Sequence, residues 1–201
     1  VLLTGATGFL GSHLLEELLK KDVTISCMAR SEEKAQKLKQ LGINVIYGDL
    51  QKPETLTGIT KGIDTVIHLA AIYDLSCPWD LLYSTNVLGT NYLATDAIKN
   101  GVEHFIHTST IAAMGPSRVP PSNEDAEMKP IQKYGKTKMI SEHNLKKLYE
   151  EQGLPVTILR PTLIYGPGDM YSTYSILRAV KKGRFKRLPG KADKHFHMTF
   201  V

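Results

Sequence analysis

Cysteine, tryptophan and long apolar runs are scarce in this sequence of 201 residues, and their scarcity excludes several protein classes. Its two cysteines, Cys27 and Cys77, are too few for a disulfide framework and lack the spacing of a metal site. No apolar run approaches the ~20 residues that a membrane-spanning helix needs. The net charge of +5 is mild, and no basic stripe with interleaved aromatic residues indicates nucleic acid binding. We therefore expect a cytoplasmic protein without a membrane or nucleic acid partner.

Short apolar runs alternate with helix-period stretches along most of the chain. The runs predict strands over Val1–Leu3, Val23–Met28, Val45–Tyr47, Thr65–Leu69, His104–Thr108 and Val156–Leu159. Helices are predicted over Gly11–Lys20, Glu32–Leu41 (capped by Ser31), Glu54–Ile59, Asp80–Lys99 and Tyr134–Gln152. Strands with so little polar alternation are typical of parallel sheets covered by helices on both faces. The pattern predicts an α/β fold with a doubly wound parallel sheet of the Rossmann type.

The alternation stops near Tyr165, where a loop, one helix and a stretch without clear period follow. We predict a dinucleotide-binding domain over residues 1–164 and the truncated beginning of a substrate-binding part over residues 165–201. The sequence also begins without methionine, inside a predicted strand. We expect it to be a piece of a longer polypeptide.

Three glycines, Gly5, Gly8 and Gly11, lie between the first predicted strand and the first predicted helix. Gly5 permits a tight turn, Gly8 lets backbone N–H groups approach a pyrophosphate, and Gly11 lets the helix pack closely on the sheet. Phosphates then lie at the helix N-terminus, where unpaired N–H groups and the helix dipole favour negative charge. The arrangement predicts dinucleotide binding.

The second predicted strand ends without the acidic residue that would bind the ribose 2′-hydroxyl of NAD. Arg30 stands there instead, with Lys34 and Lys37 one and two helical turns further on. Arg30 can pair with a 2′-phosphate, so the sequence favours NADP over NAD. The alternative is that Arg30 only stacks over the adenine.

Tyr134 and Lys138 lie four residues apart at the start of a predicted helix, and therefore on one face of it. A phenol with its ordinary pKa near ~10 is a poor base at neutral pH, and a neighbouring ammonium group lowers that pKa. We expect Tyr134 to exchange a proton with a substrate oxygen, and Lys138 to lower the pKa of Tyr134 and to bind the nicotinamide ribose.

The chain resembles the extended branch of the short-chain dehydrogenase/reductase superfamily, that is, the NAD-dependent epimerase/dehydratase family, and within it the dihydroflavonol-reductase-like enzymes. The motifs that carry the resemblance follow in order over essentially the whole chain: TGATGFLG (4–11), GDL (48–50), HLAA (68–71), NVLGT (86–90), HTST (107–110), YGKTK (134–138) and RPTLIYGPGD (160–169). The resemblance implies a nicotinamide cofactor that exchanges hydride with a carbonyl or alcohol carbon.

The resemblance also implies roles for single residues. Thr110 completes the catalytic set with Tyr134 and Lys138 by binding the reacting oxygen, with Ser109 as the near alternative. Asp49 binds the adenine amino group, Asn86 helps to hold the active-site network, and Pro161 and Thr162 line the nicotinamide. The expected cofactor-binding residues are Gly5, Thr7, Gly8, Phe9, Leu10, Gly11, Arg30, Lys37, Asp49, Leu50, Leu69, Ala70, Ala71, Asn86, Thr108, Ser109, Tyr134, Lys138, Pro161 and Thr162.

Two further residues near these motifs are expected to be structural. A single histidine at a strand end, such as His68, is more often structural than catalytic. Arg160 is expected to be the partner of a buried ion pair.

Three functions remain open at this stage. Arg30 and the stretch AAIYDL (70–75) favour a reductase or dehydrogenase that acts on a small-molecule carbonyl or alcohol. A nucleotide-sugar epimerase, which would use the bound cofactor transiently, is the alternative. The second alternative is a non-catalytic protein that binds NADP as a sensor. By resemblance we also expect a homodimer that forms through the helices Asp80–Lys99 and Tyr134–Gln152.

Overall fold

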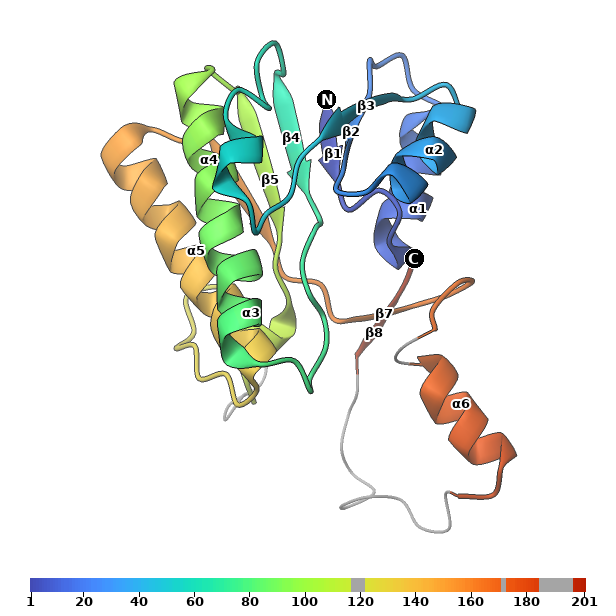
Figure 1. The fold of residues 1–201 in the computed structure, drawn as a ribbon. Coiled ribbons are helices and arrows are strands. Elements are labelled where there is room, and N and C mark those ends of the chain that lie inside the picture. The colour runs from blue at the N-terminus through green and yellow to red at the C-terminus, as the bar shows by residue number, and fades with distance from the viewer. Residues whose placement is uncertain (117–121, 171–172, 185–196) are drawn as a thin grey trace. The chain divides into compact units, whose positions relative to one another are not determined.

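The computed structural model describes residues 1–116, 122–170, 173–184 and 197–201. These divide into two compact units, Val1–Arg160 and Pro161–Val201. In the first unit, six parallel strands form one sheet in the order β3-β2-β1-β4-β5-β6 (Figure 1). This is the strand order of a doubly wound dinucleotide-binding sheet, so the predicted fold class is confirmed.

The elements of the first unit follow the predicted alternation. The strands are β1 (Leu2–Thr4), β2 (Ser26–Ala29), β3 (Asn44–Tyr47), β4 (Thr65–His68), β5 (His104–Thr108) and β6 (Val156–Leu159). The α-helices are α1 (Phe9–Leu18), α2 (Glu32–Gln40), α3 (Trp79–Tyr83), α4 (Thr90–Lys99) and α5 (Lys133–Gln152). Shorter turns of helix are η1 (Pro53–Leu56), η2 (Ser84–Gly89) and η3 (Ile111–Ala113).

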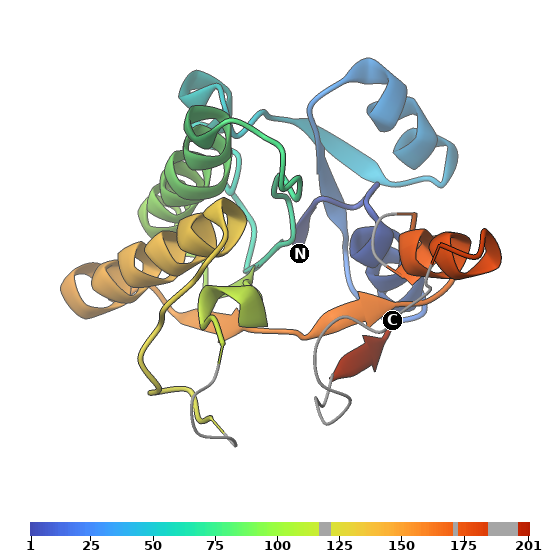
Figure 2. The same cartoon turned by 90° about the horizontal axis from the view of Figure 1, so that it is seen from below.

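Helices cover both faces of the sheet, as Figures 1 and 2 show. Successive residues of a strand point to opposite faces, so Leu2 and Leu3 of β1 belong to two different apolar clusters. The Leu2 cluster includes residues of α4 and α5, and the Leu3 cluster includes residues of α1 and α2. Cys27 lies in the second cluster, where burial raises the pKa of its thiol to about 11, so its predicted role as a small core residue is confirmed.

Two predicted element boundaries are wrong for local reasons, and one predicted cap is placed correctly but makes no side-chain bond. The helix expected over Glu54–Ile59 is the short 3-10 helix η1, which begins at Pro53 and is followed by Gly58 with φ 74°. The strand expected from Val23 begins at Ser26, because the N–H of Val23 closes a turn onto the carbonyl of Lys21. Ser31 is the N-cap of α2, but its side chain makes no capping hydrogen bond.

The long helix expected over Asp80–Lys99 consists of three consecutive pieces, namely α3, η2 and α4. The middle piece, η2, is π-helical and contains Asn86. Such π segments inside α-helices are frequently found at functional sites. The backbone carbonyl of Asn86 accepts hydrogen bonds from the hydroxyls of Thr90 and Ser141, at 2.8 and 2.6 Å.

The second unit contains α6 (Thr173–Lys181) and a two-stranded parallel sheet formed by β7 (Leu163–Tyr165) and β8 (Met198–Phe200). The single helix was expected from the sequence, whereas the two short strands were not. Among the described residues, no helix has both the length and the apolar character needed to cross a lipid bilayer.

Candidate active site

A cleft of about 230 Å³ lies at the carboxyl ends of β1 to β4, where ligands bind in open parallel sheets. Its walls come from the end of β2, from the segments that follow the four strands, and from one residue of η2. The lining residues are Gly5, Thr7, Gly8, Met28, Ala29, Arg30, Lys34, Gly48, Asp49, Leu50, Leu69, Ala70, Ala71, Ile72 and Thr85. Nine of the predicted cofactor-binding residues are among them: Gly5, Thr7, Gly8, Arg30, Asp49, Leu50, Leu69, Ala70 and Ala71.

The turn between β1 and α1 requires its glycines. Gly5 has φ 76°, and a Cβ atom there would approach the backbone nitrogen of Ala70 to 2.8 Å. A Cβ atom on Gly11 would collide with the carbonyl oxygen of Gly5, so Gly11 lets the helix close on the turn itself. Gly8 is the N-cap of α1 and has no side chain to occupy the free N–H groups at this helix terminus. Those N–H groups are available to an anion.

One end of the cleft combines two basic residues with one acidic residue. Arg30 and Lys34 line it together with Asp49. Lys37 is not among the lining residues, and its ammonium group pairs with Glu33 at 3.2 Å. The cation that joins Arg30 at the cleft is therefore Lys34, one turn earlier on α2 than the predicted Lys37.

The cleft fits a dinucleotide cofactor in two respects. The N-cap of α1 is Gly8, so no side chain covers the free N–H groups at the helix terminus where the cofactor phosphates would lie. The hydroxyl of Thr85, which lines the cleft, is buried and has no hydrogen-bond partner among the described residues. Buried polar groups are rarely left without a partner, so a ligand group that bonds Thr85 is consistent with the site.

Tyr134 and Lys138 lie on the first two turns of α5, and both side chains are buried, with 9% and 2% of their surfaces exposed. Burial, with a smaller contribution from the neighbouring Tyr73, raises the pKa of Tyr134 to about 12. Burial lowers the pKa of Lys138 to about 7, against a smaller opposing effect of Glu142.

The expectation that Lys138 lowers the pKa of Tyr134 is therefore wrong for the protein without cofactor. The physical reason is that both groups are withdrawn from water, which disfavours the charged form of each. Near neutral pH the phenol of Tyr134 is protonated, and Lys138 releases its proton at a far lower pH than an exposed lysine does. In this protonation state Tyr134 can donate a proton to a substrate but cannot accept one from it.

The hydroxyls of Ser109 and Thr110, at the end of β5, have different partners. Ser109 is buried and donates its proton to the carboxylate of Glu142. Thr110 is the N-cap of η3, and its oxygen accepts the N–H of Ala112 at 3.1 Å. The proton of Thr110 thus remains available to another oxygen, whereas that of Ser109 is engaged.

Asn86 connects three parts of the site but does not line the cleft. Its side-chain oxygen accepts the N–H of Ile72 at 2.8 Å, and its amide donates to the Ile72 carbonyl at 3.0 Å. The amide also donates to the hydroxyl of Thr137 at 3.2 Å, and that hydroxyl donates to the carbonyl of Tyr134 at 2.8 Å. Asn86 therefore fixes the segment after β4 to the turn of α5 that carries Tyr134.

His68 is enclosed between two hydroxyls. Its Nδ1 lies 2.8 Å from Thr4 Oγ1 and its Nε2 lies 2.9 Å from Thr90 Oγ1. Thr4 accepts from the N–H of Ala70, and Thr90 donates to the carbonyl of Asn86, so the network assigns the proton to Nε2 of a neutral ring. Burial lowers the pKa of His68 to about 3, with Lys138 contributing. These contacts give His68 a structural role.

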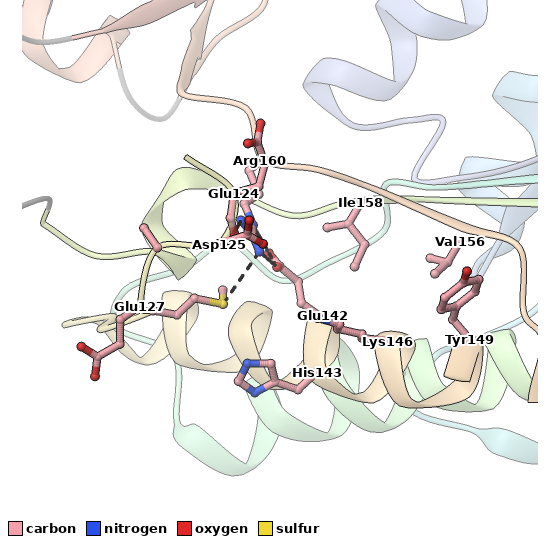
Figure 3. Close-up of a pocket in the computed structure, with 12 residues that line it drawn as sticks. Glu124, Asp125, Glu127, Glu142, His143, Lys146, Tyr149, Val156, Ile158 and Arg160 are labelled. Carbon is pink, nitrogen blue, oxygen red and sulfur yellow. Dashed lines mark hydrogen bonds and ion pairs between the residues drawn. The ribbon is translucent and has the colours of Figure 1, made fainter. Parts of the chain in front are cut away.

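Arg160 forms the ion pair expected of it, and its partner is Glu142 at 2.6 Å. It also donates to the backbone carbonyl of Glu124 at 2.9 Å, which fixes the segment before α5 (Figure 3). A cavity of about 610 Å³ surrounds this pair and shares no lining residue with the cleft. The cavity is thus separate from the predicted cofactor site.

Several predicted cofactor-binding residues have no observed place in the cleft. Phe9 and Leu10 form the first turn of α1 with Gly11, and Thr108 is the last residue of β5. Pro161 and Thr162 belong to the second unit, where the hydroxyl of Thr162 lies 2.8 Å from that of Thr199. Their contacts with a cofactor stay predictions.

Sequence reasoning missed several residues that belong to the site. Met28, Gly48, Ile72 and Thr85 line the cleft, Tyr73 contacts Tyr134, and Glu142 engages Ser109. Thr85 and Ile72 each adjoin a residue that the motifs did identify, Asn86 and Ala71. Glu142 lies one helical turn after Lys138, and this spacing was a signal that could have indicated a buried partner.

Comparison with known proteins places these observations in a family. The model of the "NAD dependent epimerase/dehydratase family" matches residues 1–193. The N-acetyl-alpha-D-glucosaminyl-diphospho-ditrans,octacis-undecaprenol 4-epimerase of Escherichia coli O157:H7 is 33% identical over 204 aligned positions, which cover 100% of this chain and 59% of that protein. The 4-hydroxy-2-methyl-3-oxo-4-farnesyl-3,4-dihydroquinoline-1-oxide ketoreductase of Stigmatella aurantiaca is 30% identical, with 93% of this chain and 57% of that protein covered.

A solved structure gives a similar result. The UDP-glucuronic acid 4-epimerase of Bacillus cereus, in complex with NAD, matches with a TM-score of 0.78 and 26% identity. The match covers 90% of this chain and 63% of that one. The chain therefore spans less than two thirds of the length of these three proteins.

Proposed function

Since the chain belongs to the NAD-dependent epimerase/dehydratase family, we propose that it is the cofactor-binding part of an NADP-dependent oxidoreductase that reduces a carbonyl group or oxidises an alcohol. The observation that carries this proposal is the position of Tyr134 relative to the cleft. Ile72 lines the cleft, the next residue contacts the ring of Tyr134, and Asn86 fixes Ile72 to the start of α5. A cofactor in the cleft and the proton on Tyr134 would thus serve one reaction.

The cofactor would be held by the glycine turn at its phosphates, by Arg30, Lys34 and Asp49 at its adenosine end, and by Thr85 through the buried hydroxyl. When bound, the nicotinamide supplies or accepts the hydride that the protein itself cannot provide. The Bacillus cereus structure is a complex with NAD, which supports a nicotinamide dinucleotide in this cleft.

We assign the proton chemistry to three side chains. Tyr134, protonated at neutral pH, donates its proton to the carbonyl oxygen of the substrate. Thr110 donates a hydrogen bond to the same oxygen. Its hydroxyl accepts the N–H of Ala112, which leaves the hydroxyl proton available for this bond. Lys138, with its pKa lowered to about 7, returns a proton to Tyr134.

A nucleotide-sugar epimerase is the second candidate, and the likeness to the UDP-glucuronic acid 4-epimerase of Bacillus cereus favours it. The two reactions differ in what happens to the cofactor. A reductase consumes added NADPH in proportion to the carbonyl compound, whereas an epimerase turns over without added cofactor. Following NADPH absorbance with a panel of ketones, aldehydes and UDP-sugars distinguishes them.

We propose a preference for NADP over NAD from Arg30 and Lys34. A charge-assisted pair with the 2′-phosphate is worth about 1.5–3 kcal/mol, or roughly 10- to 100-fold in affinity.

Arg30→Ala is thus expected to weaken NADPH binding at least tenfold and to leave NADH binding within about twofold, as measured by fluorescence titration. Lys37→Ala is the control, since Lys37 pairs with Glu33. A wild-type protein that binds NADH ten times more tightly than NADPH would contradict the preference.

We also propose a homodimer that forms through α3, η2, α4 and α5. Leu81, Leu88 and Tyr92 are exposed apolar side chains of this region, which supports a covered surface. Multi-angle light scattering is expected to give twice the chain mass. A monomer at micromolar concentration would contradict the proposal.

Two further proposals concern the surroundings of the protein. Cys27 and Cys77 are free thiols, which supports a reducing compartment such as the cytoplasm. We also propose that residues 165–201 begin the part that binds the substrate. The assays above would establish whether that substrate is a carbonyl compound, an alcohol or a sugar nucleotide.

A further inference from the structure

Tyr73 makes the only ring contact of Tyr134 among the described residues. The two ring centroids are 4.9 Å apart and the ring planes are inclined by 81°. Edge-to-face pairs of this kind stabilise the mutual orientation of two rings. Tyr73 is 50% exposed, whereas Tyr134 is 9% exposed, so Tyr73 covers Tyr134 while keeping half of its own surface open.

The segment that carries Tyr73 is fixed at both ends. On one side, Asn86 binds both backbone groups of Ile72. On the other side, the carboxylate of Asp74 accepts the N–H and the hydroxyl of Ser76, at 2.8 and 2.6 Å, and Cys77 is buried. The position of Tyr73 against Tyr134 is therefore imposed by its surroundings.

A short path of hydrogen bonds connects Ile72 with Tyr134 through two side chains. It runs from Ile72 through the amide of Asn86 to the hydroxyl of Thr137, and from there to the carbonyl of Tyr134. These bonds hold the segment that carries Tyr73 and the turn that carries Tyr134 in one arrangement.

We propose that Tyr73 is a positioning residue that holds the ring of Tyr134 in its reactive orientation and presents its own open half to the substrate as a wall of the reaction site. The proposal rests on the proposed function, because it assigns Tyr134 as the proton donor. Tyr73 follows directly on the cleft-lining residues 69–72, at the carboxyl edge of the sheet. A substrate carbonyl that reaches Tyr134 from this side must pass the exposed face of Tyr73.

The pKa of Tyr134 gives a test that needs no substrate. Tyr73 raises that pKa by contributing to burial and by its own phenolate charge. Tyr73→Phe removes the charge alone, and Tyr73→Leu removes the charge and the ring. The measurement is the titration of Tyr134 by NMR in protein labelled with ¹³C at tyrosine Cζ. We expect the pKa of Tyr134 to be highest in the wild type, lower in Tyr73→Phe and lowest in Tyr73→Leu. Circular dichroism checks at each pH that the protein is folded. If Tyr134 has the same pKa in all three proteins, the proposed influence of Tyr73 on Tyr134 is refuted.

Steady-state kinetics test the second half of the proposal, with NADPH and the compound that the wild type reduces fastest from the panel above. Tyr73→Leu is expected to lower kcat/KM about tenfold and to leave the Kd of NADPH within about twofold, because Tyr73 does not line the cleft. Tyr73→Phe is expected to recover most of the loss. Tyr149→Leu, which alters a tyrosine of α5 that is 58% exposed, is the matched control. An unchanged kcat/KM in Tyr73→Leu would overturn the role.

The two assays separate this proposal from the proposed function. If the wild type consumes no NADPH and interconverts no sugar nucleotide, the proposed function fails. The titration order then still decides whether Tyr73 sets the environment of Tyr134. If the wild type is active and Tyr73→Leu matches it in both assays, only the role of Tyr73 is refuted.

Discussion

Replacing Tyr134 by phenylalanine is expected to lower kcat/KM for carbonyl reduction by about 10²- to 10⁴-fold, the usual contribution of a positioned proton donor. The substitution removes the hydroxyl and keeps the ring, so the contact with Tyr73 is retained. Because Tyr134 does not line the cleft, the Kd of NADPH is expected to change by less than about threefold. NADPH absorbance and fluorescence titration measure the two quantities.

Tyr149→Phe is the matched control for this variant, since it removes a hydroxyl from an exposed tyrosine of the same helix. It is expected to behave as the wild type. A Tyr134→Phe protein that keeps more than a tenth of wild-type kcat/KM would show that another group donates the proton. Such a protein that retained its full biological activity would instead favour the non-catalytic, cofactor-binding alternative.

Replacing Lys138 by methionine is expected to make the cofactor-free protein more stable and the enzyme at least about 10²-fold less active. The ammonium group is buried, and its pKa falls from 10.5 to about 7 on folding. Methionine has no charge to bury and no proton to release on folding, so the substitution removes the cost that the lowered pKa records. Such opposition between stability and activity is typical of active-site residues.

The pH dependence of this effect has a definite sign. Between pH 7 and pH 10.5 the unfolded chain binds a proton at Lys138 that the folded chain does not bind, so wild-type stability rises with pH across this window. The advantage of Lys138→Met is therefore largest at and below pH 7 and shrinks towards pH 10. Urea unfolding at pH 7 and pH 9.5 measures it, with Lys136→Met, an exposed lysine of α5, as control. A variant less stable than the wild type at pH 7 would contradict the burial of an ammonium group.

The sequence was sufficient for the architecture because the relevant signals are local. The near-continuous apolar runs mark strands that helices bury on both faces, and Gly5 marks a turn that no side chain tolerates. The family that the motifs indicate is also the family whose model matches the chain. Errors arose where a neighbouring residue decided the outcome, as at Pro53 and Gly58, which limit the third predicted helix to a short 3-10 turn.

The chemistry of the site depends on distances that the sequence does not contain. The spacing of Tyr134 and Lys138 placed them on one face of α5, but the depth of that face reversed the expected pKa shift of Tyr134. The difference between Ser109 and Thr110 became evident only when Glu142 was seen to accept the hydroxyl of Ser109. Tyr73 lies 61 positions before Tyr134, so only the fold brings the two rings together.

A crystal structure of the protein with bound NADPH tests most directly whether the glycine turn and Tyr134 serve one cofactor. We predict that the pyrophosphate lies at the N-terminus of α1 and that the nicotinamide ring lies beside Tyr134, with its reactive carbon within roughly 3–4 Å of the space where a substrate carbon can sit. A nucleotide bound in the cavity beside Arg160, or a nicotinamide ring directed away from Tyr134, would contradict the proposed reaction.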